Sequence, residues 1–172
     1  MLSIKRLKNR AIAKVITLFP ALAGRFIEAY KPWESEDIPW TPVKKRLDGS
    51  TVAIVTTSGV HRKDQTPFNM HDQNGDPSFR EINGNTPVQD LMITHDYYDH
   101  TDAEKDLNIV FPIERLREFA SEGIISKAAD THYSFMGHIM GPYIYTLMEV
   151  NAPEVAVRLK KQKVDYVLLT PG

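Results

Sequence analysis

The feature that most constrains the fold is a hydrophobic segment, Val164 to Leu169, that runs into Thr170-Pro171-Gly172. The residues before it have helical spacing, with Pro153 at a suitable first position and Val155 and Leu159 on one face. A helix, a buried strand and a glycine turn form the repeating unit of α/β proteins, which place reactive groups at such turns. We therefore predict a Rossmann-like α/β fold with a mostly parallel sheet and flanking helices. Because no helix follows, we expect it to be C-terminally truncated.

The composition narrows the class of protein. With 42% hydrophobic and 25% charged residues, the 172-residue chain resembles an ordinary soluble domain with its own core. Its 21 basic and 22 acidic residues give no overall charge that would attract nucleic acid, so we expect no nucleic-acid partner. The chain has no cysteine, which excludes a disulfide, a thiolate metal site and a thiol nucleophile within these residues.

Residues 1–31 are predicted to form a basic amphipathic helical extension. They hold seven Lys and Arg residues against Glu28 alone. Their apolar residues recur at helical steps: Ile4, Leu7, Ala11, Val15, Leu18, Leu22 and Phe26. We expect this helix to pack on the protein's own body or on a partner; the alternative is peripheral contact with an anionic membrane surface. The prolines and tryptophans of residues 32–42 predict a linker, and residues 43–172 are predicted to be an incomplete α/β domain.

Polar clusters follow several predicted strands. The strand Thr51–Thr57 leads into residues 58–61, Leu91–Thr94 into residues 95–102, and Ile124–Ala128 into residues 130–133. The carboxyl ends of parallel strands meet at one edge of a sheet. We therefore expect Ser58 to His61, His95 to Asp99 and Tyr133 to Gly137 to converge near Gly172.

The densest polar cluster is His95 to Asp102. If these residues were helical, His95, Asp99 and Asp102 would share a face, and imidazoles with carboxylates can ligate zinc, manganese or iron. The alternative is a surface loop whose aspartates cap turns and pair with the histidines. We assign no metal site, since the spacing matches no closed ligand signature.

Two further groups are candidates for chemistry. Arg80, in the segment Gly75 to Glu81, could hold a substrate carboxylate through paired hydrogen bonds, with Asp76 beside it. A structural pair between Arg80 and Asp76 or Glu81 is the alternative. His132 could position an imidazole for proton transfer, although a histidine among apolar residues is more often simply hydrogen-bonded.

A set of sequence blocks becomes distinctive when taken together: Trp40-Thr41-Pro42-Val43, Ser58-Gly59-Val60-His61, residues 75–82, residues 106–113, Phe135-Met136-Gly137 and residues 164–172. In this order they resemble the selenoprotein B family of glycine, sarcosine, betaine and D-proline reductases. The resemblance runs from about Trp40 to Gly172. The first 35 or so residues look like an extension outside the family core.

The resemblance implies an activity, which we state as an expectation. In that family, selenocysteine or cysteine follows the segment that matches Thr170-Pro171-Gly172, and a further cysteine lies close behind. Selenocysteine is encoded by a stop codon, so we expect that this chain was ended at such a codon. A selenol or thiol there would sit at a helix N-terminus, which favours its nucleophilic anion.

The family implies that this anion cleaves the carbon–nitrogen bond of an amine or amino acid. A second thiol then closes a selenenyl sulfide that an external dithiol system reduces. The implied partners are a reductase subunit that carries a pyruvoyl group, a thiol or selenol carrier or thioredoxin-like reductant, and the small substrate. We expect a cytoplasmic location, Arg80 and Asp76 at the substrate, and His61, His95 or His132 as the group that protonates the departing amine.

Two alternatives from other classes remain. The chain could be a non-catalytic truncated module for binding or assembly, docked through its basic helix. It could also be a small metal-dependent hydrolase that uses His95, Asp96, Asp99 and His100.

Overall fold

The computed structural model describes residues 4–19, 21, 24 and 40–172. Its strands are β1 (Thr51–Thr56), β2 (Val60–Arg62), β3 (Arg80–Asn83), β4 (Leu91–Ile93), β5 (Lys127–Ala128), β6 (Thr131–Ser134) and β7 (Tyr166–Thr170). Its α-helices are α1 (Ile4–Leu18), α3 (Thr101–Lys105), α4 (Ile113–Ser121), α5 (Pro142–Tyr145) and α6 (Ala152–Lys161), with a π-helical stretch, Thr146–Asn151, between the last two. Short 3₁₀ turns lie at Leu47–Gly49, Val88–Asp90 and Leu107–Ile109. Most of the predicted linker, residues 32–39, lies outside the described residues, as do the later residues of the predicted extension.

The fold is mixed α/β, and its main sheet is mostly parallel. β1 lies at the centre and pairs in parallel with β7 along residues 52–56. It also pairs in parallel with β5 at its start and with β6 at its end, and β3 adds antiparallel to β6. β2 and β4 form a separate antiparallel pair. The predicted parallel sheet with flanking helices is therefore confirmed.

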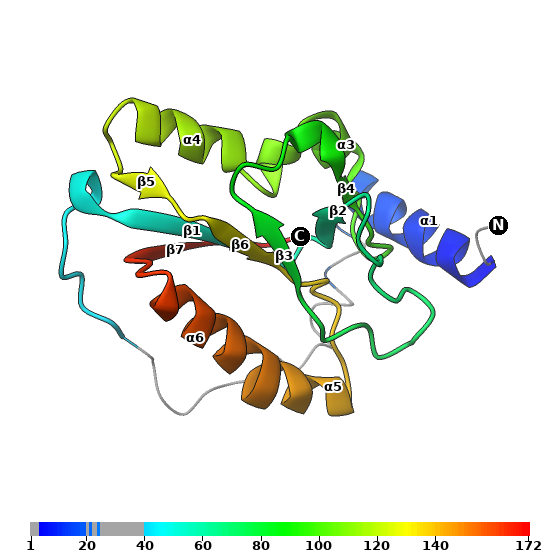
Figure 1. Ribbon diagram of the computed structural model, residues 1–172. Helices are drawn as coiled ribbons and strands as arrows, with labels where there is room; N and C mark the ends of the chain where they lie inside the picture. The colour runs from blue at the N-terminus through cyan, green and yellow to red at the C-terminus, as the bar shows by residue number, and fades with distance from the viewer. Residues whose placement is uncertain (1–3, 20, 22–23, 25–39) are drawn as a thin grey trace.

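Helices cover both faces of this sheet. Figure 1 shows α4 on one face and α6 on the other. Alternate residues of β1 point to the two sides: Val52 and Ile54 pack in the cluster that contains Leu116 of α4, whereas Ala53 packs in the cluster that contains Leu159 of α6. A strand buried on both faces is a continuous apolar run, which explains why residues 51–55 lack a polar–apolar alternation.

His132 is part of the sheet. β7 occupies one edge of β1 along its length, so β5 and β6 must share the other edge, with a break between them. At this break the N–H of Ile54 donates to His132 Nδ1 over 2.9 Å. The imidazole therefore replaces a missing strand carbonyl, and it lies fully buried with its ring edge-on to Phe111. This contact satisfies a buried backbone donor that would otherwise destabilise the core.

Several local predictions can now be compared with the structure. The strands at residues 51–57, 91–94 and 164–169, the helix at 112–121 and the helix before β7 are confirmed within a few residues. Residues 95–100 are a bend rather than a helix, and α3 begins at Thr101. The helical arrangement of His95, Asp99 and Asp102 is therefore wrong. The cause is local: Asp99 accepts hydrogen bonds from the Thr101 N–H and hydroxyl, which closes a turn immediately before the helix.

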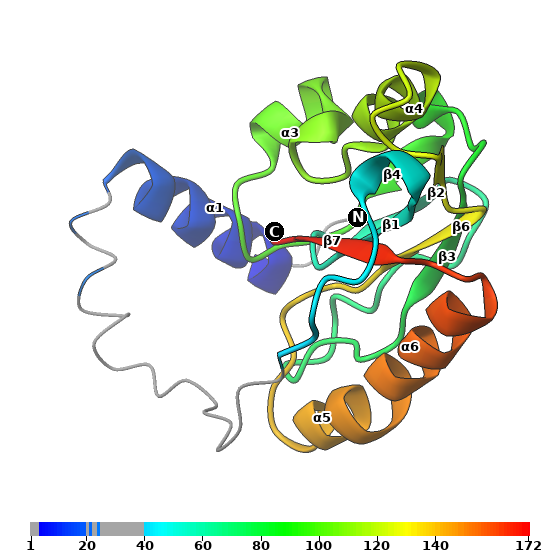
Figure 2. The ribbon, with the colours of Figure 1, turned by 90° about the vertical axis from the view of Figure 1, so that its left-hand side faces the viewer.

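α1 projects from the body of the protein beside residues 95–101, as two views at right angles show (Figures 1 and 2). It is anchored by Arg6, which makes an ion pair with the buried Asp96. None of the described helices is long and apolar enough to cross a membrane.

The burial of His132 predicts a pH dependence of stability. Burial lowers the pKa of His132 from 6.5 to about 4, because desolvation penalises the imidazolium. Below pH 6.5 the unfolded chain therefore binds a proton that the folded protein excludes, and stability falls as the pH drops towards about 4.

The test is His132→Gln, whose side-chain carbonyl can accept from Ile54 but does not titrate. Between about pH 7.5 and about pH 5, the free energy of unfolding should fall by about 2 kcal/mol less in this variant than in the wild type. Urea denaturation at the two pH values measures this difference. The exposed His71→Gln is the matched control and should keep the wild-type pH dependence. An unchanged pH dependence in His132→Gln would contradict the assignment.

Candidate functional site

Three segments from distant parts of the sequence meet at the carboxyl ends of β1, β6 and β7. We call them the strand-end turns: residues 57–59, 135–137 and 170–172. The N–H of Thr57 donates to the carbonyl of Thr170 (3.0 Å), and the N–H of Gly59 donates to the carbonyl of Phe135 (2.9 Å). The N–H of Gly172 reaches the hydroxyl of Thr57 at 3.3 Å. The expected convergence near Gly172 is confirmed for the segments after β1 and β6. His95 to Asp99 reach the same region through the Tyr98 hydroxyl, but they follow β4 of the separate antiparallel pair and not a strand of the parallel sheet, and His61 lies within β2 of that pair.

Glycine is required where these turns touch. A Cβ on Gly137 would lie 2.4 Å from the carbonyl oxygen of Thr57, and Gly137 has a φ of +89°. A Cβ on Gly172 would lie 2.6 Å from the Cα of Ser58. Neither position has room for a side chain without movement of the backbone. The backbone after β7 is therefore held directly against the backbone after β1.

Buried hydroxyl groups fix the same strand ends from within. The hydroxyl oxygens of Thr56, Ser58 and Thr170 gather around one carbonyl oxygen, that of Val110, at 3.0, 3.5 and 2.7 Å, and the two shorter contacts are the hydrogen bonds donated by Thr56 and Thr170. Thr56 and Ser58 also form a short hydrogen bond with each other. The carbonyl of Val110 lies just before α4, so this cluster ties the ends of β1 and β7 to the helix layer. Sequence reasoning missed it, because Ser and Thr at strand ends carry no distinctive spacing.

Residues 95–98 form one wall of this region. The hydroxyl of Tyr98 donates to the carbonyl of Ser58 at 3.2 Å, and the carbonyl of Gly59 accepts from the N–H of Thr94 at 2.9 Å. Burial raises the pKa of Tyr98 well above its ordinary value, so the phenol stays protonated. The Tyr98 ring lies 4.6 Å from the His95 ring, centroid to centroid. Tyr98 was not among the residues singled out from the sequence.

His95 is the candidate histidine that belongs to this wall. Its Nδ1 accepts from the N–H of Tyr97 at 3.0 Å, which leaves the proton on Nε2. Desolvation, followed by the charges of His100 and His138, lowers the pKa of His95 to about 4 against the opposing effect of a hydrogen bond to the Met136 backbone, so the ring is neutral near pH 7 and is held by the protein like that of His61. His95 also lines a cavity of about 480 Å³ between α1 and the body.

His61 and His132 occupy different positions. His61 is buried in β2, with Nδ1 bonded to the carbonyl of Arg62 (2.7 Å) and Nε2 to the hydroxyl of Thr94 (2.8 Å). Desolvation lowers its pKa. Both ring nitrogens are thus engaged by the protein. His132 lies inside the sheet, where its Nδ1 accepts from Ile54. The structure does not bring these three imidazoles together.

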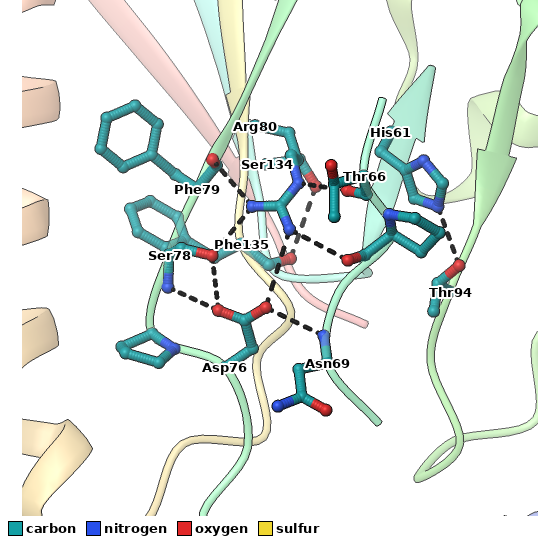
Figure 3. A network of polar contacts seen from close by, with 12 residues as sticks. His61, Thr66, Asn69, Asp76, Ser78, Phe79, Arg80, Thr94, Ser134 and Phe135 are labelled. Atoms are coloured by element: carbon teal, nitrogen blue, oxygen red, sulfur yellow. Dashed lines mark hydrogen bonds and ion pairs between the residues drawn. The ribbon is translucent and has the colours of Figure 1, made fainter. Parts of the chain in front are cut away.

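Arg80 and Asp76 form a network that holds the loop between β2 and β3 (Figure 3). The guanidinium donates from Nε to the carbonyl of Thr66 (2.8 Å), from Nη1 to the Ser78 hydroxyl (2.8 Å) and from Nη2 to the carbonyl of Pro67 (3.2 Å). Asp76 lies 3.6 Å from the guanidinium and accepts from the N–H of Asn69 at 2.9 Å. These contacts occupy the donors of Arg80 and favour the structural pairing that the sequence left open.

The alternative of a metal-dependent hydrolase gains no support. Over the part of the chain that the structure describes, no three His, Asp, Glu or Cys side chains are gathered so that they could hold a metal ion. Asp96 instead pairs with Arg6, and Asp99 accepts from the hydroxyl of Thr101 in a turn before α3.

Taken together, the fold and the strand-end turns define an α/β protein with its candidate site at the carboxyl ends of parallel strands. Comparison with known proteins identifies one family. The profile of the family described as glycine/sarcosine/betaine reductase selenoprotein B matches residues 5–172. The chain therefore belongs to this family. Because the match begins at residue 5, the expectation that the first 35 or so residues fall outside the family is wrong.

Individual relatives agree with this assignment. The chain is 45% identical over 133 residues to the D-proline reductase subunit gamma of Acetoanaerobium sticklandii, covering 77% of this chain and 53% of the relative. It is 30% identical over 136 residues to the glycine reductase complex component B subunit gamma of Symbiobacterium thermophilum, covering 77% of this chain and 31% of the relative. It is 29% identical over 135 residues to the betaine reductase complex component B subunit beta of Peptoclostridium acidaminophilum, covering 73% and 29%.

The aligned region thus spans about half the length of the first of these relatives and less than a third of the other two. No solved structure matches the chain.

The close contact at Gly137 predicts a large cost for Gly137→Ala. The new methyl group would clash with the Thr57 carbonyl, and alanine at positive φ is strained. We expect a loss of about 2 to 4 kcal/mol in the free energy of unfolding, measured by urea denaturation. Gly123→Ala is a matched control, because Gly123 has a φ of +72° but open space around its Cβ position. Equal losses in the two variants would show that the backbone contact at Gly137 contributes nothing.

The network around Arg80 predicts that Arg80→Lys lowers stability. Lysine cannot reach the carbonyls of Thr66 and Pro67 and the Ser78 hydroxyl at once, so we expect a loss of about 2 kcal/mol. Thermal melts measure it, with the exposed Arg46→Lys as control. Steady-state kinetics provide the opposing outcome: a raised KM for an amino-acid substrate with an unchanged melting temperature would place Arg80 at the substrate instead.

Proposed function

We propose that this chain is part of a B-component-like subunit of a reductase that cleaves the carbon–nitrogen bond of glycine, sarcosine, betaine or D-proline. The nucleophile is a selenol or thiol at the position after Gly172. The observation that carries the proposal is the set of strand-end turns: a family match through Gly172 coincides with the place where three backbone segments are locked together. The proposal also takes the sheet to be the first part of a Rossmann-like domain.

The geometry explains why a reactive group would be placed there. Gly172 packs on Ser58, and the hydroxyl cluster on Val110 fixes the end of β7. A residue that follows Gly172 would therefore start from a fixed backbone position, which lowers the cost of orienting it for attack. Unsatisfied N–H groups of a helix that begins after this turn would stabilise its anion.

Two neutral proton carriers border this position. Tyr98 donates its hydroxyl proton to the Ser58 carbonyl, and His95 lies beside Tyr98 with a proton on Nε2. We propose that His95, after taking up a proton to become the imidazolium, protonates the departing amine and returns to the neutral ring. An anion bound near the imidazole would raise its pKa from the low value that burial imposes. In this proposal His61 and His132 support the fold, and Arg80 and Asp76 shape the loop beside the site.

Two further requirements of the proposed reaction must be met by other components of a reductase complex. The selenenyl sulfide or disulfide formed after the reaction needs an external dithiol, and the amine needs activation by a pyruvoyl group on a partner subunit. The relatives are named as subunits and components of reductase complexes, which supports other subunits as partners. A cytoplasmic location fits small soluble substrates and a dithiol reductant.

The test compares three proteins in an assay of substrate-dependent dithiol oxidation with the partner subunits present. The full-length protein should be active, and a full-length variant with serine at the position after Gly172 should be inactive. The 172-residue chain should also be inactive, because it has no thiol or selenol for reversible redox chemistry. Activity of the serine variant or of the 172-residue chain would contradict the proposed nucleophile.

A further inference from the structure

The face of α1 that contacts the body of the protein is not its most apolar face. Successive helical residues are separated by about 100°, so the predicted apolar stripe forms one face. We call this face the α1 stripe: Ile4, Leu7, Ala11, Val15 and Leu18. The opposite face meets the body of the protein through less apolar residues: Arg6, Asn9, Ala13 and Ile16 are half-buried or buried. The stripe itself is largely exposed, with Ile4 89%, Leu7 62% and Leu18 64% exposed, and its residues Leu7 and Ala11 also border a hollow against residues 98–101.

The orientation of α1 is fixed by its polar anchor. Arg6 Nε lies 2.5 Å from Asp96 Oδ2, and Arg6 Nη2 lies 3.2 Å from Asp96 Oδ1, a bidentate geometry. Asp96 is only 2% exposed, so rotation of the helix to bury its stripe would leave a buried carboxylate without this cation. The exposed stripe is therefore a consequence of how the helix is held.

The charges on α1 decide between candidate occupants. Residues 4–19 contain no Asp or Glu, and Lys8, Arg10 and Lys14 are exposed. Two such helices from two copies of this chain would repel each other, which disfavours self-association through the stripe. Lys8 projects between Val15 and Phe19 on the helical wheel, so a bilayer that took up the stripe would also have to accommodate an ammonium group at its edge. A protein groove can instead offer carboxylates to it.

We propose that the α1 stripe is the docking surface for another subunit of the reductase complex, which receives the helix in an apolar groove with an acidic rim. This mode is the insertion of an amphipathic helix into a groove, with anchors at three- and four-residue steps. The inference rests on the proposed function for the identity of the partner. The inference also places the docked subunit relative to the candidate site. Because α1 is anchored at Asp96, the subunit lies beside residues 95–101 and hence beside Tyr98, which contacts the strand-end turns.

The test measures association of the full-length protein with the purified pyruvoyl-containing subunit of the same reductase. Leu7→Glu and Val15→Glu each place a carboxylate on the stripe and should weaken binding about tenfold or more. Thr17→Glu adds the same charge to an exposed position off the stripe and should bind like the wild type. Lys8→Glu tests the acidic rim and should also weaken binding. Circular dichroism of each variant checks that the helix is retained.

The results distinguish a wrong docking surface from a wrong proposed function. Stripe variants that bind the subunit as tightly as Thr17→Glu would overturn the docking surface while leaving the proposed function intact. Failure of the wild-type protein to bind the subunit would contradict both. Flotation with phosphatidylcholine vesicles that do or do not contain phosphatidylglycerol is run in parallel. A membrane contact would replace the proposal under two conditions. The wild type would have to bind the anionic vesicles, and Leu7→Glu would have to lose that binding while it still binds the subunit as tightly as the wild type.

Discussion

The close packing of Gly137 and Gly172 against the backbone at Thr57 and Ser58 is the constraint on which the candidate site depends. It requires β1, β6 and β7 to end at the same level, and the shared acceptor at Val110 holds two of these strands at that level from inside. The wall formed by residues 94–98 then closes on the same turns through Gly59 and Ser58. The backbone at Gly172, after which we propose the nucleophile, is therefore held in place from several sides.

Two buried imidazoles stabilise the sheets that carry the strand-end turns and the wall beside them. His132 fills the break between β5 and β6 as a hydrogen-bond acceptor, and His61 joins β2 to β4 through the hydroxyl of Thr94. Both have lowered pKa values, because burial disfavours the charged ring. A lowered pKa does not distinguish a catalytic histidine from a structural one, since desolvation produces it in either case. Of the three candidates, His95 borders the strand-end turns, and the proposal of a catalytic role for it rests on that location.

The sequence predicted the parts of the fold that depend on local pattern. The apolar runs at β1 and β7, the helical spacing of α4 and α6 and the shared edge at the strand ends all follow from periodicity and topology. It did not predict contacts that depend on tertiary geometry. The bond between Ile54 and His132 exists because a strand breaks there, and the anchor between Arg6 and Asp96 joins residues 90 positions apart. The same anchor explains why α1 exposes the stripe that periodicity alone would bury.

The proposed function requires a selenol or thiol directly after Gly172, where the strand-end turns would hold it. The most direct measurement is mass spectrometry of the tryptic peptide of the natural protein that begins at Val164, after treatment with iodoacetamide. We predict that this peptide continues past Gly172 into selenocysteine or cysteine, and that this residue is alkylated in the reduced protein. A peptide that ends at Gly172, or that continues with neither residue next, would contradict the account.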